Sequence, residues 1–298
     1  MTIMDYDVAL IGFGEAGHTF ALSAGWRDRA TAYDRKTDDP SECASKRGDY
    51  ASAGVIEARS AAEAAQSAAL VLSLVTADEA LEAARSAAQG LRANTLYCDG
   101  NSVAPETKRT AAKFIEGVGA HYVDMAILAP VNPLGLSVPI ILSGPKSGDA
   151  ASVLAGLGFD STRIIGADVG RASAIKMIRS IMVKGVEALT AECVLAASCA
   201  GVLDEVLASL DASEKPQGWR ERADYNLDRM LVHGLRRAAE MEEVAKTLED
   251  LALRPSMTSG TILRQRELGQ LGGIVPAGLD GKLRRIEDHF AKDRMSTA

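Results

Sequence analysis

The chain has few cysteines, no long hydrophobic run and no surplus of basic residues, and each of these absences excludes a class of protein. Its four cysteines show no C-x-x-C spacing and no neighbouring histidine, so we read them as free thiols and expect no zinc or other metal site. No stretch of about 18 or more apolar residues occurs, which argues against a membrane-spanning helix.

The charge balance argues against nucleic acid as a partner. Asp and Glu total 40 against 33 Lys and Arg, for a net charge of -7, and the basic residues are scattered along the chain. A nucleic-acid surface needs a concentrated basic stripe. The first residues lead at once into an apolar strand pattern, without a basic n-region or a cleavage site. We therefore expect a cytoplasmic protein with no membrane partner.

Residues 6–165 alternate short apolar or β-branched runs with alanine-rich helical patterns. This alternation predicts a Rossmann-type, doubly wound α/β domain with a parallel sheet covered by helices. Strands are predicted at 7–14, 30–34, 54–58, 69–75, 94–99, 121–127, 139–144 and 162–166. Helices are predicted at 15–25, 60–67, 77–89, 104–116 and 147–156.

The second half of the chain is predicted to be all α. Helical patterns cover 170–200, 203–210, 218–252, 256–268 and 279–292. We therefore predict a dinucleotide-binding domain at 1–168 and an all-helical substrate and dimerisation domain at 169–298, joined by a long interdomain helix. At about residue 192 this helix changes from one narrow polar strip to small or apolar residues on every side. A helix buried on all sides predicts a homodimer.

A glycine-rich turn follows the first predicted strand. The segment VALIGFGEAG has the G-x-G-x-x-G spacing, in which the glycines permit a tight turn, a close approach of the backbone to a pyrophosphate, and close packing of helix on strand. Asp34 ends the second strand about 20 residues later, where a carboxylate binds ribose hydroxyls. Cofactor contacts are predicted from Gly12, Phe13, Gly14, Glu15, Ala16, Gly17, Asp34 and Arg35.

The cofactor is NAD or NADP, with a slight preference for NAD. Asp34 would repel a 2′-phosphate, which favours NAD. Arg35 and Lys36 follow it directly and could instead pair with that phosphate. A solvated turn is an equally good reading of these two cations.

Three further motifs make the chain resemble the β-hydroxyacid dehydrogenase superfamily, which includes 6-phosphogluconate dehydrogenase, 3-hydroxyisobutyrate dehydrogenase and tartronate semialdehyde reductase. DGNSVAPET at 99–107 is similar to its D-x-S-T-x-x-P element, and GRASAIKMIRS at 170–180 to its catalytic helix. HGLRRAAEMEEVAKTL at 233–248 is similar to a branch with a C-terminal helical domain without a settled role. The resemblance covers nearly the whole chain.

The resemblance implies that Lys176 is the catalytic acid or base, which exchanges the hydroxyl proton while hydride moves to or from the nicotinamide. A partly desolvated ammonium has its pKa lowered and can serve this role. The resemblance also implies that Val75 and Thr76 line the loop crossed by the cofactor, and that Asn101 and Ser102 lie beside the nicotinamide or substrate.

The sequence also departs from the family pattern. Ser180 stands where the family usually has Asn, and Leu128, Ala129 and Pro130 stand where it has a Ser-Gly-Gly turn. Proline has no N–H to donate, so the expected pocket has fewer donors and a more apolar wall. Substrate contacts are predicted from Ser102, Leu128, Arg179, Ser180 and His233, with a satisfied core or interface histidine as the alternative for His233.

These observations predict an NAD(P)-dependent dehydrogenase or reductase that interconverts an alcohol and a carbonyl. Its small-molecule substrate is expected to carry a sizeable apolar or aromatic portion. One alternative is an imine reductase, against which the retained lysine argues. Another is a non-catalytic dinucleotide-binding regulator, against which Lys176 and the intact glycine turn argue.

Overall fold

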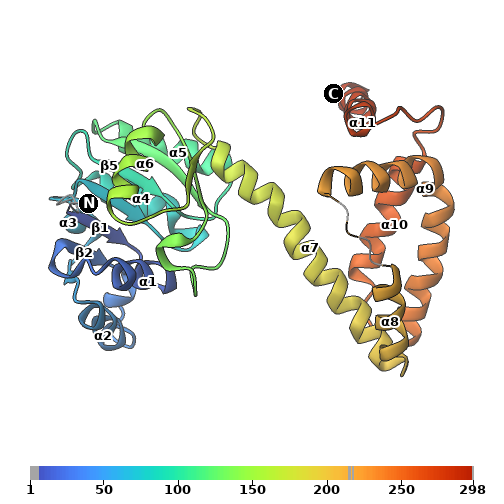
Figure 1. Cartoon of the computed structure of the whole chain (residues 1–298), viewed down its shortest axis with the longest axis horizontal. Helices are drawn as coiled ribbons and strands as arrows, with labels where there is room; N and C mark the ends of the chain where they lie inside the picture. The colour runs from blue at the N-terminus through green and yellow to red at the C-terminus, as the bar shows by residue number, and fades with distance from the viewer. Residues whose placement is uncertain (1–6, 214–215, 217, 297–298) are drawn as a thin grey trace. The chain divides into compact units, whose positions relative to one another are not determined.

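The computed structural model describes residues 7–213, 216 and 218–296. The chain divides into two compact units between residues 182 and 183, within one long helix, and each unit is described by itself (Figure 1). The predicted domain boundary at 168/169 lies just before that helix begins. The predicted boundary and the observed one therefore differ only in the domain to which the first turns of the helix are assigned.

The first unit is built on one eight-stranded sheet, and all eight strands were predicted. They are Val8–Ile11 (β1), Ala30–Tyr33 (β2), Ile56–Glu57 (β3), Leu70–Ser73 (β4), Leu96–Asp99 (β5), His121–Ile127 (β6), Ile140–Ser143 (β7) and Thr162–Ile164 (β8). The order β3-β2-β1-β4-β5-β6-β7-β8 reverses direction between β1 and β4. This order confirms the Rossmann-type fold and puts the expected ligand crevice beside β1.

The sheet is not wholly parallel, which corrects the prediction. Strand β7 runs antiparallel to β6, and Asp124 lies opposite Ser143. The connection at 128–139 contains only the short 3-10 turn Gly135–Ser137 (η4). A parallel pairing usually needs a crossover through an α-helix, and this connection contains none, so it favours the antiparallel return.

Two apolar layers cover the two faces of the sheet, as the doubly wound fold requires. The helices of this unit are Glu15–Ala24 (α1), Cys43–Ala53 (α2), Ala61–Ala65 (α3), Ala80–Ala88 (α4), Pro105–Glu116 (α5) and Ser147–Gly156 (α6). One buried cluster joins strand residues to α1, α2 and α6, and the other joins alternate strand residues to α3, α4 and α5. Shorter 3-10 turns lie at Arg27–Arg29 (η1), Arg35–Thr37 (η2) and Ala77–Glu79 (η3).

Helix α2 is absent from the prediction, which left 43–53 without a helix. Its buried positions are Lys46, Tyr50 and Ala53. The spacing is helical, but a lysine occupies one of the three inward positions. The Lys46 ammonium donates to the Phe13 carbonyl at 2.8 Å and pairs with Asp49 at 2.7 Å, so its charge is compensated. A buried cation therefore hid the amphipathic pattern.

The second unit is helical, as predicted. Its helices are the later part of Arg171–Cys199 (α7), Leu203–Ser213 (α8), Trp219–Asp250 (α9), Ser256–Gly269 (α10) and Leu279–Ser296 (α11). Helices α9 and α10 cross closely at Gly234 and Gly269, where an added Cβ would overlap the backbone of the other helix. Lys282 of α11 is buried and pairs with Asp224 of α9 at 2.8 Å.

After residue 192 α7 is not enclosed within the single chain, so its expected burial on every side, by a helical domain or by a partner's, stays a prediction. Cys193 and Leu195 are exposed, and Ala197 is buried. Helices of one unit alone do not enclose this segment. Among the described residues, no helix is long and apolar enough to cross a membrane, and all four cysteines are free thiols.

Candidate active site

The three glycines of the turn between β1 and α1 have the three distinct geometries that a dinucleotide turn requires. Gly12 has φ of +86°, and an added Cβ would lie 2.5 Å from the Leu74 carbonyl oxygen. A Cβ on Gly17 would lie 2.8 Å from the Gly12 carbonyl oxygen. A Cβ on Gly14, by contrast, would meet nothing within 4 Å, so its space is open to a ligand.

The start of α1 is free to bind an anion. Gly14 is its N-cap residue and supplies no side-chain cap. The first N–H groups of a helix lack intrahelical acceptors and lie at the positive end of the dipole. Open space next to unsatisfied donors is the arrangement that binds a phosphate.

Asp34 joins the turn to the end of β2. Its Oδ2 accepts the N–H of Phe13 at 2.8 Å, and its Oδ1 accepts the N–H of Lys36 at 3.0 Å. These bonds fix the direction of the carboxylate. A cavity of about 380 Å³ lies beside it, and its lining includes Gly12, Gly14, Asp34, Arg35, Val75 and Thr76. Six of the predicted cofactor residues therefore share one cavity.

The other predicted cofactor residues of the turn direct their side chains elsewhere. The Phe13 ring is fully buried against Tyr50, and Ala16 packs against the same core. The Glu15 carboxylate accepts a hydrogen bond from the Asn132 amide at 3.0 Å. A cofactor contact from Phe13, Glu15 or Ala16 would therefore have to use the backbone.

Both cations that follow Asp34 have acidic partners. Arg35 pairs with Glu79 of η3, and Lys36 pairs with Glu42 at 2.7 Å. The Arg35 side chain is 64% exposed, so its pair contributes little to stability. A 2′-phosphate would have to compete with Glu79 for the guanidinium.

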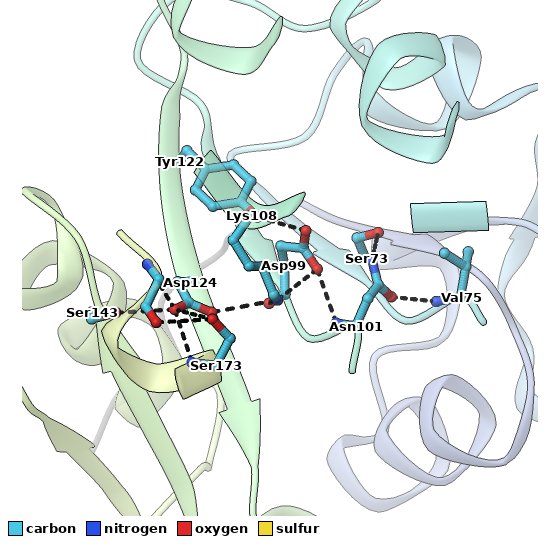
Figure 2. A network of polar contacts seen from close by, with 10 residues as sticks. Ser73, Val75, Asp99, Asn101, Lys108, Tyr122, Asp124, Ser143 and Ser173 are labelled. Carbon is cyan, nitrogen blue, oxygen red and sulfur yellow. Dashed lines mark hydrogen bonds and ion pairs between the residues drawn. The ribbon is translucent and has the colours of Figure 1, made fainter. Parts of the chain in front are cut away.

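Polar residues form one row across neighbouring strands, at the carboxyl ends of β4 and β5 (Figure 2). Ser73 of β4, Asp99 of β5, Asp124 of β6 and Ser143 of β7 are paired in register with one another, and each is completely buried. Ile11, the last residue before the glycine turn, continues the row on β1. The row therefore lies level with the start of the cofactor turn.

Lys108 of α5 supplies the positive charge within this row. Its buried ammonium lies 2.9 Å from Oδ1 of Asp99 and 3.4 Å from Oδ1 of Asp124 (Figure 2). It also donates to the Asp99 carbonyl oxygen at 2.5 Å. Tyr122 donates to Oδ2 of Asp99 at 2.6 Å. Burial, followed by this carboxylate, holds the Tyr122 pKa well above its usual value, so the phenol keeps its proton.

Asn101 connects the row to the cofactor loop. Its N–H donates to Asp99 at 2.9 Å, and its side-chain oxygen accepts the Val75 N–H at 2.6 Å. Its amide nitrogen donates to Ser73 at 2.9 Å. Only 3% of Asn101 is exposed, so its side chain shapes the loop of Val75 and Thr76 from beneath. Its predicted contact with cofactor or substrate stays a prediction.

The row also holds the first turn of α7. Oδ2 of Asp124 accepts the N–H of Gly170 at 3.1 Å and that of Ser173 at 3.0 Å. Oγ of Ser143 accepts the N–H of Ala172 at 3.0 Å. Side chains of β6 and β7 thus take the donors that a helix start leaves unsatisfied.

The predicted catalytic helix residues lie within the next two turns. Lys176 is half-buried, three residues beyond Ser173, and Arg179 is exposed. The Ser180 hydroxyl donates to the Lys176 carbonyl oxygen at 2.9 Å. In this structure Ser180 uses its donor within the helix, and its predicted substrate contact stays a prediction.

The remaining predicted substrate residues lie on three separate segments. Leu128 is half-buried and packs against the cluster of Ala126, Ile141 and Ala172, which includes the first turn of α7. Ser102 is exposed in the loop after β5. His233 is half-buried on α9 in the second unit. Their substrate roles stay predictions.

Sequence reasoning missed Lys108, Asp124 and Ser143. The signal for Asp124 and Ser143 was a single polar residue at the same register position of neighbouring apolar strands, which becomes visible only when the strands are aligned side by side. Lys108 itself falls in a predicted helix with other charged residues, and nothing local marks it as buried. Among the described residues, no group of three or more His, Cys, Asp or Glu side chains could hold a metal ion.

Two family models match the chain in succession. The NAD-binding domain of 6-phosphogluconate dehydrogenase matches residues 7–131, and a domain of unknown function, DUF1932, matches residues 197–268. The first match covers the glycine turn and the polar row as far as β6. The second lies entirely in the helical unit.

Similar proteins extend these matches to nearly the full length. A conserved hypothetical protein from Sinorhizobium meliloti is 36% identical, with 95% of this chain and 96% of that chain covered and a TM-score of 0.59. An uncharacterised 28.5 kDa protein from Methanothermus fervidus is 28% identical over 260 residues, which are 85% of this chain and 95% of the relative.

A more distant solved structure shares the fold. An imine reductase from Myxococcus stipitatus in complex with NADP+ has a TM-score of 0.70 at 19% identity, with 89% of this chain and 94% of that chain covered. The glycine turn, the two family models and the 36% identical relative together identify the family. The chain belongs to the proteins that join a 6-phosphogluconate dehydrogenase-type NAD-binding domain to a DUF1932 domain, within the β-hydroxyacid dehydrogenase superfamily, whose fold is that of NAD(P)-dependent oxidoreductases.

Proposed function

We propose that the protein is an NAD(P)-dependent oxidoreductase that interconverts an alcohol and a carbonyl, with Lys176 as general acid and base. One observation carries this proposal. The helix that bears Lys176 starts on the same row of the sheet that leads into the cofactor turn. Cofactor and lysine would therefore be held by one rigid element.

The residues of the first unit fit a dinucleotide. The open space at Gly14 and the uncapped start of α1 suit a pyrophosphate, and Asp34 suits the ribose hydroxyls. When bound, the nicotinamide cofactor would give or accept the hydride. The chain itself must bind the cofactor, orient it and exclude water.

Lys176 would move the proton. The side chain is half-buried, on the helix whose start the polar row holds. An amine so placed can take the hydroxyl proton during oxidation and return it to the carbonyl oxygen during reduction.

We further propose a substrate with a sizeable apolar portion. Leu128, Ala129 and Pro130 offer apolar surface, and the backbone N–H of Leu128 already donates to the Pro139 carbonyl oxygen at 2.9 Å. A small hydroxy acid would lose water there without full replacement, at a cost of roughly 1–3 kcal/mol for each unpaired polar group. Arg179 is exposed and could pair with an anionic group of the substrate.

Imine reduction is the second candidate, because imine reductases share the fold at TM-scores up to 0.70. A protein of that kind would turn over a ketone only when an amine is also supplied. The lysine favours alcohol and carbonyl chemistry, since an ammonium can protonate a carbonyl oxygen directly.

A substrate panel followed through nicotinamide absorbance tests this proposal. It comprises 3-hydroxyisobutyrate, tartronate semialdehyde, 3-hydroxy-3-phenylpropanoate, aryl alcohols, and aryl ketones with and without methylamine, each with NAD(H) and NADP(H). We expect the best kcat/KM on a compound with an apolar portion, without amine. Preference for the two small acids would contradict the proposed pocket, and turnover that requires methylamine would favour imine reduction.

The Lys176→Met variant tests the proton step. It keeps the alkyl stem and should lose on the order of 10² to 10⁴ in kcat while binding the cofactor normally. Lys184→Met is the matched control, because Lys184 is an exposed lysine two turns further along the same helix. Equal activity of the two variants would remove Lys176 from the mechanism.

A further inference from the structure

We infer that Asp124 is a positioning residue: together with Lys108 it fixes the start of α7 and thereby the place of Lys176. The inference rests on the proposed function for the role of Lys176. It concerns a buried carboxylate outside the cavity beside the glycine turn.

The first evidence is the fate of the N–H groups at the start of α7. Asp124 accepts from Gly170 and Ser173, Ser143 accepts from Ala172, and the Arg171 N–H reaches the Asp168 carbonyl oxygen at 3.3 Å. Helix starts are ordinarily capped by one local side chain. Here the strands β6 and β7 provide the side-chain acceptors, so the helix start is attached to the sheet as well as to its own loop.

The second evidence is the charge. Asp124 is completely buried, and a buried carboxylate is costly to desolvate unless it is paired and hydrogen-bonded. Four donors lie within hydrogen-bond distance of its Oδ2, namely two backbone N–H groups and the hydroxyls of Ser143 and Ser173 at 3.2 Å each, while Oδ1 faces the Lys108 ammonium at 3.4 Å. A neutral side chain could cap a helix at a lower desolvation cost. The negative charge of Asp124 therefore does more than cap the helix.

The third evidence is what Lys108 connects. Its ammonium contacts Asp99, which in turn accepts the N–H of Asn101, the residue that supports the Val75 loop of the cofactor cavity. The same ammonium faces Asp124, which holds α7. One buried cation therefore lies between the support of the cofactor loop and the support of the catalytic helix (Figure 2).

The consequence for Lys176 follows from helix geometry. Ser173 and Lys176 are three residues apart and lie on the same face, about 4.5 Å apart along the axis. A carboxylate that fixes the N–H of Ser173 fixes the rotation and height of the helix at Lys176. Hydride and proton transfer are sensitive to displacements of about 1 Å, so a loosened helix start should slow the reaction.

The test compares Asp124→Asn with Glu192→Gln in the full-length protein. Glu192 caps α10 in the same manner, since it accepts the N–H groups of Met257 and Thr258 at 2.9 Å each. It lies in the second unit and is matched to Asp124 in chemistry. Acetylation of Lys176 at pH 8 in the presence of NADH, relative to Lys184, is followed by mass spectrometry. Turnover is measured on the best compound of the panel.

In Asp124→Asn we expect the Lys176 to Lys184 labelling ratio to rise about threefold or more, because a looser helix start exposes the amine more often. We expect kcat to fall about tenfold or more, with NADH affinity little changed. Glu192→Gln should change neither quantity. An unchanged labelling ratio and unchanged kcat in Asp124→Asn would overturn the inference.

Ser143→Ala covers the case in which Asp124→Asn does not fold. It removes the acceptor of the Ala172 N–H and one donor to Asp124, and should shift the labelling ratio in the same direction by a smaller factor. No shift in a folded Ser143→Ala protein would also contradict the inference. If Lys176→Met retains full turnover while Asp124→Asn still changes the labelling ratio, the proposed role of Lys176 fails and the anchoring of α7 stands.

Discussion

The backbone N–H of Phe13 donates to the Asp34 carboxylate at 2.8 Å, which joins the glycine turn after β1 to the end of β2. The bond makes the turn and the carboxylate one unit. The position of the group that would bind ribose is therefore set by the same residues that would bind the pyrophosphate. Substitutions in the glycine turn test binding of the pyrophosphate, and substitutions beside Asp34 test binding at the ribose.

The first prediction concerns Gly14. Gly14→Val should fold normally, because nothing lies within 4 Å of the added Cβ, and should lose about tenfold or more in affinity for NADH and NADPH. Fluorescence titration measures the affinity. Gly148→Val is the control, since Gly148 lies in the first turn of α6 with the same free space. Unchanged affinity in Gly14→Val would place the cofactor elsewhere.

The second prediction concerns cofactor preference. Glu79→Gln removes the anion that pairs with Arg35, so the guanidinium becomes available to a 2′-phosphate. We expect the affinity for NADPH relative to NADH to rise by about 1.5- to fivefold, which corresponds to the ordinary range of about 0.2–1 kcal/mol for an exposed ion pair. Glu82→Gln is the control, because Glu82 also lines the cavity but pairs with Arg85. An unchanged ratio would show that Arg35 does not reach the phosphate.

The third prediction concerns the helix crossing in the second unit. Gly234→Ala should destabilise the protein by roughly 1–3 kcal/mol, because the added methyl group overlaps the backbone of α10. Gly260→Ala, at an open position of α10, should instead be neutral or stabilise by up to about 1 kcal/mol through helix propensity. Thermal unfolding distinguishes the two. Equal effects would mean that the close crossing is unimportant for stability.

The fourth prediction concerns self-association, which we propose occurs through α7 with a second copy of the chain. Ile178, Ile181 and Leu195 are 66%, 71% and 55% exposed, an unusual amount of apolar surface for one helix. Light scattering should show a dimer of the 31.3 kDa chain. Ile181→Glu should shift it toward monomer, whereas Ile274→Glu, at an apolar residue that is 94% exposed outside α7, should not. A wild-type monomer at micromolar concentration would refute the proposal.

Most of the fold was predictable because its elements carry strong local patterns. The central β-strands are predominantly apolar, and alanine-rich helices separate most of them, so all eight strands were found. Helix α2 was not, because Lys46 occupies an inward position. The reversed direction of β7 was missed because strand pairing is a relation between segments, and only the missing crossover helix at 128–139 hinted at it.

The cofactor side of the site was more predictable than the rest. Gly12, Gly14 and Asp34 lie close in sequence and share one motif, and the structure brings them into one cavity. The anchor of α7 could not be foreseen in the same way. Asp124 and Gly170 are 46 residues apart, and their contact depends on the order of strands and on the return of β7.

The shared ammonium of Lys108 also constrains how this protein can evolve. A loss of either carboxylate leaves the cation with one anionic partner instead of two, and a loss of the cation leaves two buried anions in register on neighbouring strands. Breaking a buried pair on one side costs about 3–5 kcal/mol, whereas exchanging the whole set for apolar residues can be neutral. Substitutions at Asp99, Lys108 and Asp124 should therefore be inherited together, so that lineages which abandon the charges do so at all three positions.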